Sequence, residues 1–275
     1  MIQRRQTRVV YKGRVPVGGD APISVQSMTN TPTADVAATV RQARELEERG
    51  CEIIRVAVPD RAAAEALPAI REQIAVPLIA DIHFSHRLAL AAIEAGADGI
   101  RLNPGNLKKP EHVRDVVLAA RDAGIMIRIG VNSGSVRERQ GLDVVDDEAD
   151  LVPLMVETAL GYCRQFEELG FGDIVLSLKA SGVLATIEAN RAVAARCDYP
   201  LHLGVTEAGP PGVGTVKSAV ALGVLLAEGI GDTIRVSLTG PPHREIDVAY
   251  DILACLLYTS PSPRDLSTSR MPSSA

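Results

Sequence analysis

Short apolar runs alternate along the chain with longer segments in which apolar residues recur every three or four positions. The short runs are rich in Val, Ile and Leu, which is typical of strands buried on both faces, and the longer segments are typical of amphipathic helices. Strands are predicted at 23–28, 52–58, 77–81, 98–102, 126–131, 173–178, 201–205 and 233–237. Helices are predicted at 34–50, 60–74, 85–95, 110–123, 148–169, 182–196, 212–228 and 243–256.

Eight strands that alternate with eight helices within one domain favour an α/β fold of the (β/α)8 TIM-barrel type. The main alternative is a doubly wound open sheet, which usually carries a glycine-rich turn after its first strand. The segment "QSMTNTPTAD" at 26–35 contains no glycine. The barrel is therefore the predicted fold, and it spans residues 23–256.

The segments on either side of the predicted barrel differ from it in pattern. Residues 1–22 include "TRVVYKGRVPVGGD", which predicts a β-hairpin that turns at Lys12–Gly13 and covers the bottom of the barrel. Residues 257–275 are low-complexity Ser, Pro, Thr and Arg, a composition that cannot bury enough apolar surface to order itself. Because the change is abrupt, we expect a disordered tail of non-native origin, with a natural disordered tail as the alternative.

Composition argues against nucleic acid and membrane as partners. The net charge is −5, aromatic residues make up 3% and Trp is absent, so the chain offers neither a basic face nor a set of stacking platforms. No apolar run approaches the roughly 20 residues that span a bilayer, and the start "MIQRRQTRVVYKG" lacks the apolar core of a signal peptide. A cytoplasmic location is expected.

Polar residues end six of the predicted strands at positions of matching parity. Alternate residues of a strand share one face, and inside a barrel that face opens at the C-terminal mouth. The residues are Arg55, Asp81 with His83, Arg101 with Asn103, Arg128 with Asn132, Ser177 with Lys179, and Arg235 with Ser237. We expect these side chains to converge on one mouth, although each strand end taken alone is equally well explained as chain emerging into water.

Four of these strands carry a cation among apolar neighbours, namely Arg55, Arg101, Arg128 and Lys179. Converging cations repel each other unless an anion lies between them, and guanidinium groups match phosphate oxygens in pairs. This predicts a phosphate or diphosphate ligand. Internal pairing with Asp81 and Glu207 is the alternative, but these two carboxylates leave an excess of cations once Arg235 is included.

Several sequence motifs resemble those of a known protein family. The segments "SVQSMTNT", "ADIHF", "IRLNPGN", "RIGVNSGS", "SLKAS", "GVTEAGPPGVGTVKS" and "RVSLTG" occur in this order, and residues 1–256 closely resemble the barrel domain of the 4-hydroxy-3-methylbut-2-enyl diphosphate synthase family. The resemblance implies an oxidoreductase of the methylerythritol phosphate route to isoprenoids. It would open 2-C-methyl-D-erythritol 2,4-cyclodiphosphate reductively, with flavodoxin or ferredoxin as electron donor, as a bacterial two-domain homodimer.

Matched motif by motif, the resemblance implies that Arg55, Arg101, Arg128 and Lys179 bind the diphosphate. Supporting contacts from the same mouth would come from Asp81, His83, Asn103, Asn132, Thr206, Glu207 and Ser237. His83 and Glu207 are the candidates for a catalytic role.

The cofactor is where the chain departs from the family. The family holds a [4Fe-4S] cluster through three cysteines, beginning with a C-x-x-C pair, and a glutamate in a second domain. Cys51, Cys163, Cys197 and Cys255 lie far apart and form no such pair, so no metal ligand is assigned in this chain. We therefore expect a C-terminally truncated barrel that binds the cyclodiphosphate and is inactive alone.

Three other functions stay open. Lys179 could act as the Schiff-base nucleophile of a phosphosugar aldolase, because neighbouring positive charge lowers the pKa of a lysine. A transferase barrel of the dihydropteroate synthase type shares the architecture and an anion site at the mouth. The chain could also be a non-catalytic diphosphate-binding module.

Overall fold

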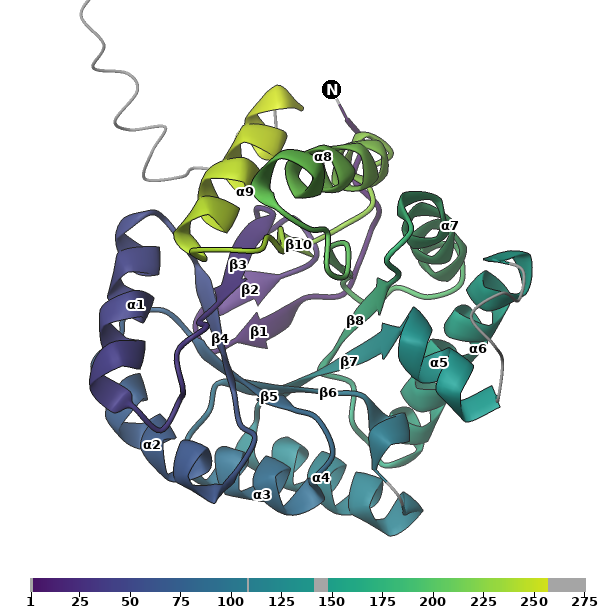
Figure 1. Ribbon diagram of the computed structural model, residues 1–275. Helices are drawn as coiled ribbons and strands as arrows, with labels where there is room; N and C mark the ends of the chain where they lie inside the picture. The colour runs from purple at the N-terminus through teal and green to yellow at the C-terminus, as the bar shows by residue number, and fades with distance from the viewer. Residues whose placement is uncertain (1, 108, 141–147, 257–275) are drawn as a thin grey trace, which may run out of the picture.

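The computed structural model describes residues 2–107, 109–140 and 148–256, and the tail predicted at 257–275 lies outside the described residues. The described residues form the predicted TIM barrel: a ring of helices encloses a sheet of parallel strands (Figure 1). The sheet has the order β8-β7-β6-β5-β4-β3-β10-β9. A bridge between Leu176 and Leu201 joins its two ends, so the sheet closes on itself.

The strands of the barrel match the predicted runs in number and position. They are β3 (Ser24–Met28), β4 (Ile53–Ala57), β5 (Leu78–Ile82), β6 (Gly99–Leu102), β7 (Met126–Asn132), β8 (Ile174–Lys179), β9 (His202–Leu203) and β10 (Thr233–Ile234). The last two are shorter than predicted. Pairing continues one residue past β10, because Arg235 N donates to Leu203 O at 3.0 Å.

Eight helices follow the strands in turn. They are α1 (Val36–Glu48), α2 (Arg61–Arg71), α3 (His86–Glu94), α4 (Pro110–Ala123), α6 (Glu148–Glu168), α7 (Val183–Ala194), α8 (Pro211–Ala227) and α9 (His243–Cys255). Local signals set several of their ends: Asp35, Asp60 and Ser85 each accept a hydrogen bond from the backbone N–H three residues on, which satisfies a donor of the first helical turn.

Two short helices lie outside the predicted set, η1 (Pro104–Asn106) and α5 (Ser133–Gln140). The segment of α5, "SGSVRERQ", contains a single apolar residue, Val136, so it has no periodic apolar face for a pattern to reveal. Both helices follow strands directly at the mouth of the barrel, where they fix the course of the loops.

The predicted hairpin is present as β1 (Val10–Lys12) and β2 (Val15–Val17), which pair antiparallel. Gly13 turns the chain with a φ of +54°, a left-handed conformation that glycine adopts without steric cost. Inside the barrel, Val10 and Val17 pack in one buried apolar layer with Ile53, Ile79, Met126 and Val175. This layer lies at the N-terminal ends of the strands, so the hairpin closes the bottom of the barrel.

Candidate functional site

The inward-facing side chains of the barrel change from apolar to charged or polar within two residues along each of β4, β5, β7 and β8. Above the apolar layer, two residues further along the same strands, the inward positions become Arg55, Asp81, Arg128 and Ser177. The strand register sets Asp81 opposite Arg101, and Arg101 opposite Arg128. Neighbouring parallel strands therefore place these charges side by side, as the parity of the sequence predicts.

A cavity of about 260 Å³ opens at this level, at the C-terminal ends of the strands. Its lining contains five cations and two carboxylates among Arg55, Asp81, His83, Arg101, Arg128, Asn132, Ser177, Lys179, Val205, Thr206, Glu207, Arg235 and Ser237. Ten of the eleven side chains predicted for the site line it; Asn103 does not. Such a polar hollow with excess positive charge is suited to a small anion with several oxygens.

Asp81 is the carboxylate at the centre of the lining. Its Oδ2 lies 3.5 Å from Arg55 Nε and its Oδ1 lies 3.3 Å from Arg101 Nη1. Burial works to raise the pKa of this carboxyl, but the two guanidinium groups outweigh burial and lower its pKa to about 2. Asp81 is therefore ionised at neutral pH and holds two of the arginines in place.

Arg235 has a different partner, which sequence patterns did not single out. Glu245, on the first turn of α9, accepts hydrogen bonds from Arg235 Nε at 3.1 Å and Nη2 at 3.2 Å. The same carboxylate accepts from Ser27 Oγ and from the backbone N–H of Leu238. Glu245 is 3% exposed. Its position in a first helical turn is typical of a solvated acid, but here the carboxylate is buried and holds Arg235 in place.

Arg128 is the most deeply set of the cations and is 1% exposed. Its Nη1 donates to Gln26 Oε1 at 2.7 Å, while its Nη2 has no partner. Burial, reinforced by Arg55 and Arg101, lowers the pKa of this guanidinium. An anion in the cavity would offer the missing acceptor.

Lys179 differs from the arginines because no hydrogen bond or ion pair is found for its Nζ among the described residues. Burial, followed by the charge of Arg128, places its pKa well below the usual value for a lysine. The amine lies against Gly204, where a Cβ would be 2.6 Å from Nζ. Gly130 gives Arg101 the same kind of room, with a Cβ there only 2.5 Å from Nε, so both cations depend on a neighbouring glycine.

The two candidates for a catalytic role sit at the rim. His83 and Glu207 are both exposed, and Glu207 adopts a φ of 48°. A non-glycine residue in this region is uncommon and such strain is typical of functional sites. Beside it, Thr206 Oγ1 is buried without a hydrogen-bond partner. The sequence left open an internal ion pair between Glu207 and the cations of the mouth. No such pair occurs among the described contacts, and Arg235 is paired with Glu245 instead.

Asn103 is placed differently from the prediction. It is 2% exposed, its Nδ2 donates to Ser135 Oγ at 2.9 Å and its Oδ1 accepts from Gly105 N at 3.1 Å. These bonds tie η1 to the start of α5. Asn103 thus shapes the loops above the cations from behind the cavity wall, because its parity is right but the chain turns away after Leu102.

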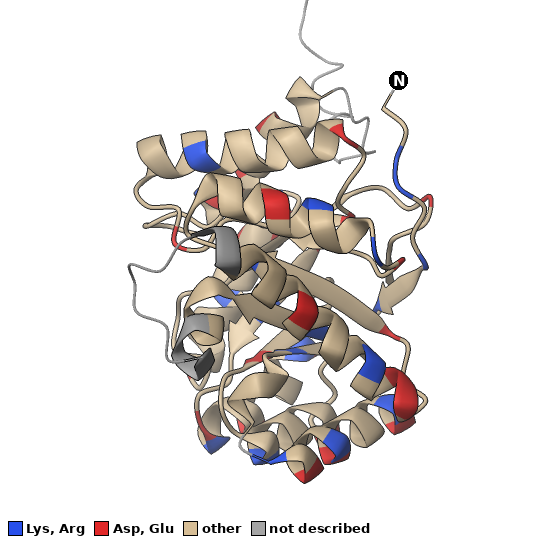
Figure 2. Cartoon of the chain, turned by 90° about the vertical axis from the view of Figure 1, so that its right-hand side faces the viewer, with Lys and Arg blue, Asp and Glu red and all other residues tan. Residues whose placement is uncertain are grey.

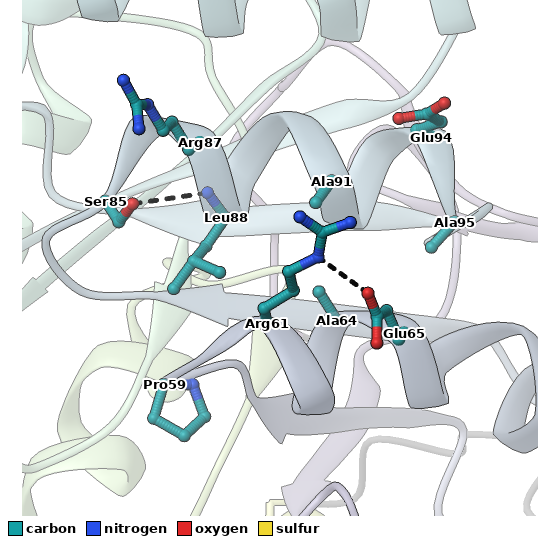
Figure 3. A pocket seen from close by; sticks show the side chains of 10 residues that line it. All are labelled: Pro59, Arg61, Ala64, Glu65, Ser85, Arg87, Leu88, Ala91, Glu94 and Ala95. Atoms are coloured by element: carbon teal, nitrogen blue, oxygen red, sulfur yellow. Dashed lines mark hydrogen bonds and ion pairs between the residues drawn. The ribbon is translucent and has the colours of Figure 1, made fainter.

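Within the described part of the chain, two further hollows lie near or outside the barrel mouth. The larger, of about 720 Å³, is on the outer surface between α2 and α3 (Figure 3) and is lined by alanines and by the Arg61–Glu65 ion pair. Charges of both signs are scattered over the outer helices (Figure 2), unlike the cationic interior. The smaller, of about 210 Å³, shares Glu207 and Ser237 with the mouth and extends it toward α8.

The described residues do not fit a metal cluster. No group of three or more His, Cys, Asp or Glu within them could hold a metal ion. Cys51 and Cys163 are buried, Cys197 is half-buried and Cys255 is exposed, and burial raises the pKa of the Cys51 thiol to about 12. A cluster ligand must be a thiolate, and burial disfavours that form at Cys51 and Cys163. No helix in the described part of the chain is long and apolar enough to cross a membrane.

Comparison with known proteins adds an independent line of evidence. Residues 7–250 match the family model described as the GcpE TIM-barrel domain. The chain is 52% identical over 256 residues to a protein of Dehalococcoides mccartyi named 4-hydroxy-3-methylbut-2-en-1-yl diphosphate synthase (flavodoxin), which covers 93% of this chain and 72% of that protein. A protein of the same name from Geobacter sulfurreducens is 54% identical over 253 residues, which covers 92% of this chain and 71% of the relative.

Solved structures show the same fold in more distant proteins. Dihydropteroate synthase from Stenotrophomonas maltophilia superposes with a TM-score of 0.66 at 14% identity and covers 97% of this chain and 100% of its own. The Yersinia pestis enzyme gives a TM-score of 0.65 at 12% identity, covering 95% of this chain and 98% of its own. At such low identity the likeness concerns the barrel architecture alone.

Proposed function

The chain belongs to the GcpE family of 4-hydroxy-3-methylbut-2-en-1-yl diphosphate synthases, and from this we propose that its barrel mouth binds 2-C-methyl-D-erythritol 2,4-cyclodiphosphate for reductive opening to the linear diphosphate. Arg55, Arg101, Arg128 and Lys179 bind the two phosphoryl groups. Asn132, Thr206 and Ser237 supply neutral hydrogen bonds around them, and His83 and Glu207 stand at the rim as the candidates for proton transfer.

One observation carries this proposal: five cations and two carboxylates line a single cavity of about 260 Å³. Buried like charges are stable together only when counter-charges lie among them. Asp81 and Glu245 pair with three of the arginines. Arg128 and Lys179 also line the cavity, and Arg128 Nη2 has no hydrogen-bond partner, nor is one found for Lys179 Nζ among the described residues. A cyclic diphosphate supplies acceptor oxygens for both.

During ring opening, negative charge grows on the phosphate oxygen as its bond to carbon breaks. Cations fixed beforehand at that oxygen stabilise the developing charge without reorganising. The barrel residues thus bind and orient the cyclodiphosphate and neutralise the charge that develops on it. The [4Fe-4S] cluster implied by the family supplies electrons, and the described cysteines do not fit it, so no step of electron transfer is assigned to residues of this barrel.

Calorimetric titration with the cyclodiphosphate tests the proposal. Arg101→Ala removes a guanidinium from the cavity while Arg55 still pairs with Asp81, and we expect an affinity loss of about 100-fold, the 2–3 kcal/mol typical of hydrogen bonds to a charged group. Arg61→Ala, at the exposed ion pair between α2 and α3, is the matched control and should change affinity by less than about twofold. Equal effects of the two substitutions would contradict the site.

Flavodoxin, named by the relatives, or ferredoxin is the proposed electron donor, and the cytoplasm is the proposed location. We further propose a homodimer. Leu184 on α7 and Val213, Val216 and Val220 on α8 are 69%, 56%, 63% and 48% exposed, and α7 lies beside α8 (Figure 1). The three valines recur at helical spacing and form one apolar stripe, a surface suited to a second copy.

Light scattering during gel filtration tests the dimer. The unsubstituted protein should elute with the mass of two chains, and Val216→Glu should give one chain because it places a charge in the centre of the stripe. Lys217→Glu, one position away on the same helix, serves as a control for charge alone and should stay dimeric. A single-chain mass for the unsubstituted protein would contradict the dimer.

A further inference from the structure

Within the cationic mouth, the one lysine is set apart from the four arginines by its contacts. Arg55 and Arg101 are held by Asp81, Arg235 is held by Glu245, and Arg128 donates to Gln26. For Lys179 Nζ no acceptor is found in the described part of the chain. The residue is half-buried and its side chain lines the cavity, so a ligand bound there lies next to it.

Lysine and arginine also differ in what they can do in such a place. A guanidinium stays charged in proteins, whereas a buried amine readily gives up its proton. The arginines therefore keep their charge whether or not a ligand is bound. The lysine is the cation whose charge can be removed to relieve repulsion, and its pKa is lowered well below the usual value, first by burial and then by the surrounding arginines.

We propose that binding of a diphosphate in the mouth is coupled to the uptake of one proton by Lys179. The proposal rests on the function proposed above and adds a thermodynamic property to the same site. In the step, the lone pair of the neutral Nζ takes a proton from solvent and becomes an ammonium group, which then donates to a phosphoryl oxygen. No other bond forms or breaks.

The charges around Lys179 agree with this. Arg55, Arg101, Arg128 and Arg235 face it from β4, β6, β7 and the end of β10. Asp81 and Glu207 line the same cavity, and Glu245 lies behind Arg235. With Lys179 protonated, five cations against three carboxylates leave two positive charges. A cyclic diphosphate with one ionised oxygen on each phosphoryl group cancels both.

Three other titratable groups lie near Lys179. His83 stands at the rim of the cavity, and His202 and Lys12 lie below it in the barrel, each buried without a hydrogen-bond partner for its side-chain nitrogens. Burial, followed by the charges of Arg128, Lys179, Lys12 and Arg55, lowers the pKa of His202, and burial also lowers that of Lys12. Neither of these two lines the cavity, so a ligand meets Lys179 first.

Calorimetry of cyclodiphosphate binding in buffers of different ionisation enthalpy measures the proton directly. Each phosphoryl group of this ligand has one ester and one anhydride linkage, and its single acidic oxygen stays ionised near neutral pH. Any proton uptake on binding is therefore uptake by the protein. We expect uptake of about one proton, and affinity that falls about tenfold for each unit of rising pH while the free amine is neutral and the bound amine is charged.

Four variants assign the proton. Lys179→Arg carries a permanent charge and Lys179→Gln carries none, so both should bind without proton uptake. Lys12→Met and His202→Gln remove the two deeper titratable groups, and both variants should still take up about one proton on binding. Ligand binding without proton uptake by the unsubstituted protein, or uptake that persists in both Lys179 variants, overturns the coupling alone. Absence of cyclodiphosphate binding at every pH overturns the proposed function with it.

Discussion

The two ends of the barrel interior are built on the same strands and do opposite things. At the bottom, Ile53, Ile79, Met126 and Val175 pack against Val10 and Val17 of the hairpin in one buried apolar cluster. Two residues further on, β4, β5 and β7 carry Arg55, Asp81 and Arg128. Apolar burial in the lower layer stabilises the fold, whereas repulsion between the buried cations of the upper layer destabilises it. One pleat repeat thus separates the part that holds the barrel from the part that binds.

The largest expected effect comes from removing the counter-charge at the mouth. Asp81→Asn leaves Arg55 and Arg101 without their carboxylate, and breaking a buried pair in this way costs about 3–5 kcal/mol. Thermal unfolding should show the loss at neutral pH, and added cyclodiphosphate should restore part of it, because a dianion replaces the missing charge. No change in unfolding temperature would contradict the role of Asp81.

The same variant has a defined pH dependence. The pKa of Asp81 is lowered to about 2 in the folded chain from an unfolded value of about 3.9. Its stabilising contribution is therefore fully present above the unfolded value and is lost as pH falls through the folded one. The difference in unfolding temperature between Asp81→Asn and the unsubstituted protein should become smaller as pH falls from about 4 to about 2.

A substitution on the same strand at the other end separates the two layers. Ile79→Ala, two residues before Asp81, removes buried apolar volume from a side chain that is 1% exposed, and such truncations cost about 2–5 kcal/mol. Chemical denaturation should show this loss. Affinity for the cyclodiphosphate, measured where the variant is folded, should change by less than about twofold, because the cations above are untouched. A large affinity loss would mean that the layers are not separable.

Gly130→Ala tests the geometry of the mouth at constant charge. Its Cβ would lie 2.5 Å from Arg101 Nε, so the guanidinium must move, and we expect an affinity loss of about tenfold, or about 1.4 kcal/mol. Gly223→Ala on α8 is the matched control, since its Cβ meets nothing within 4 Å and alanine favours a helix. Equal affinity for the two variants would show that Arg101 does not need this position.

The smallest effect is a gain in stability. Lys12→Met replaces a buried amine that has no partner, and we expect a rise in stability of about 1 kcal/mol at pH 7. Burial lowers the pKa of Lys12 in the folded chain, so below the unfolded value of about 10.4 the unfolded chain binds a proton that the folded chain does not. The gain measured by thermal unfolding should therefore shrink as pH rises toward that value.

Strand parity made most of the mouth predictable. A buried strand exposes alternate residues to the barrel interior, so a cation such as Arg101 between Ile100 and Leu102 had to point inward. The helices were predictable for the same reason, since their apolar faces repeat with the helical period. Physical periodicity, read strand by strand, therefore gave both the fold and the convergence of the charges.

What parity could not supply is contact between elements far apart in sequence. Glu245 lies in the first turn of a helix, a usual place for a solvated acid, and only the closed barrel brings it to Ser27, 218 positions away in the chain. Asn103 has the right parity, but η1 turns the chain immediately after it. The room that Gly204 leaves for Lys179 is likewise a tertiary property.

A crystal structure of the chain with bound 2-C-methyl-D-erythritol 2,4-cyclodiphosphate tests the central claim most directly. The account predicts density for two phosphoryl groups in the mouth, with oxygens within hydrogen-bond distance of Arg101, Arg128 Nη2 and Lys179 Nζ. Density in the hollow between α2 and α3, or a ligand whose phosphoryl groups point away from these cations, would contradict it.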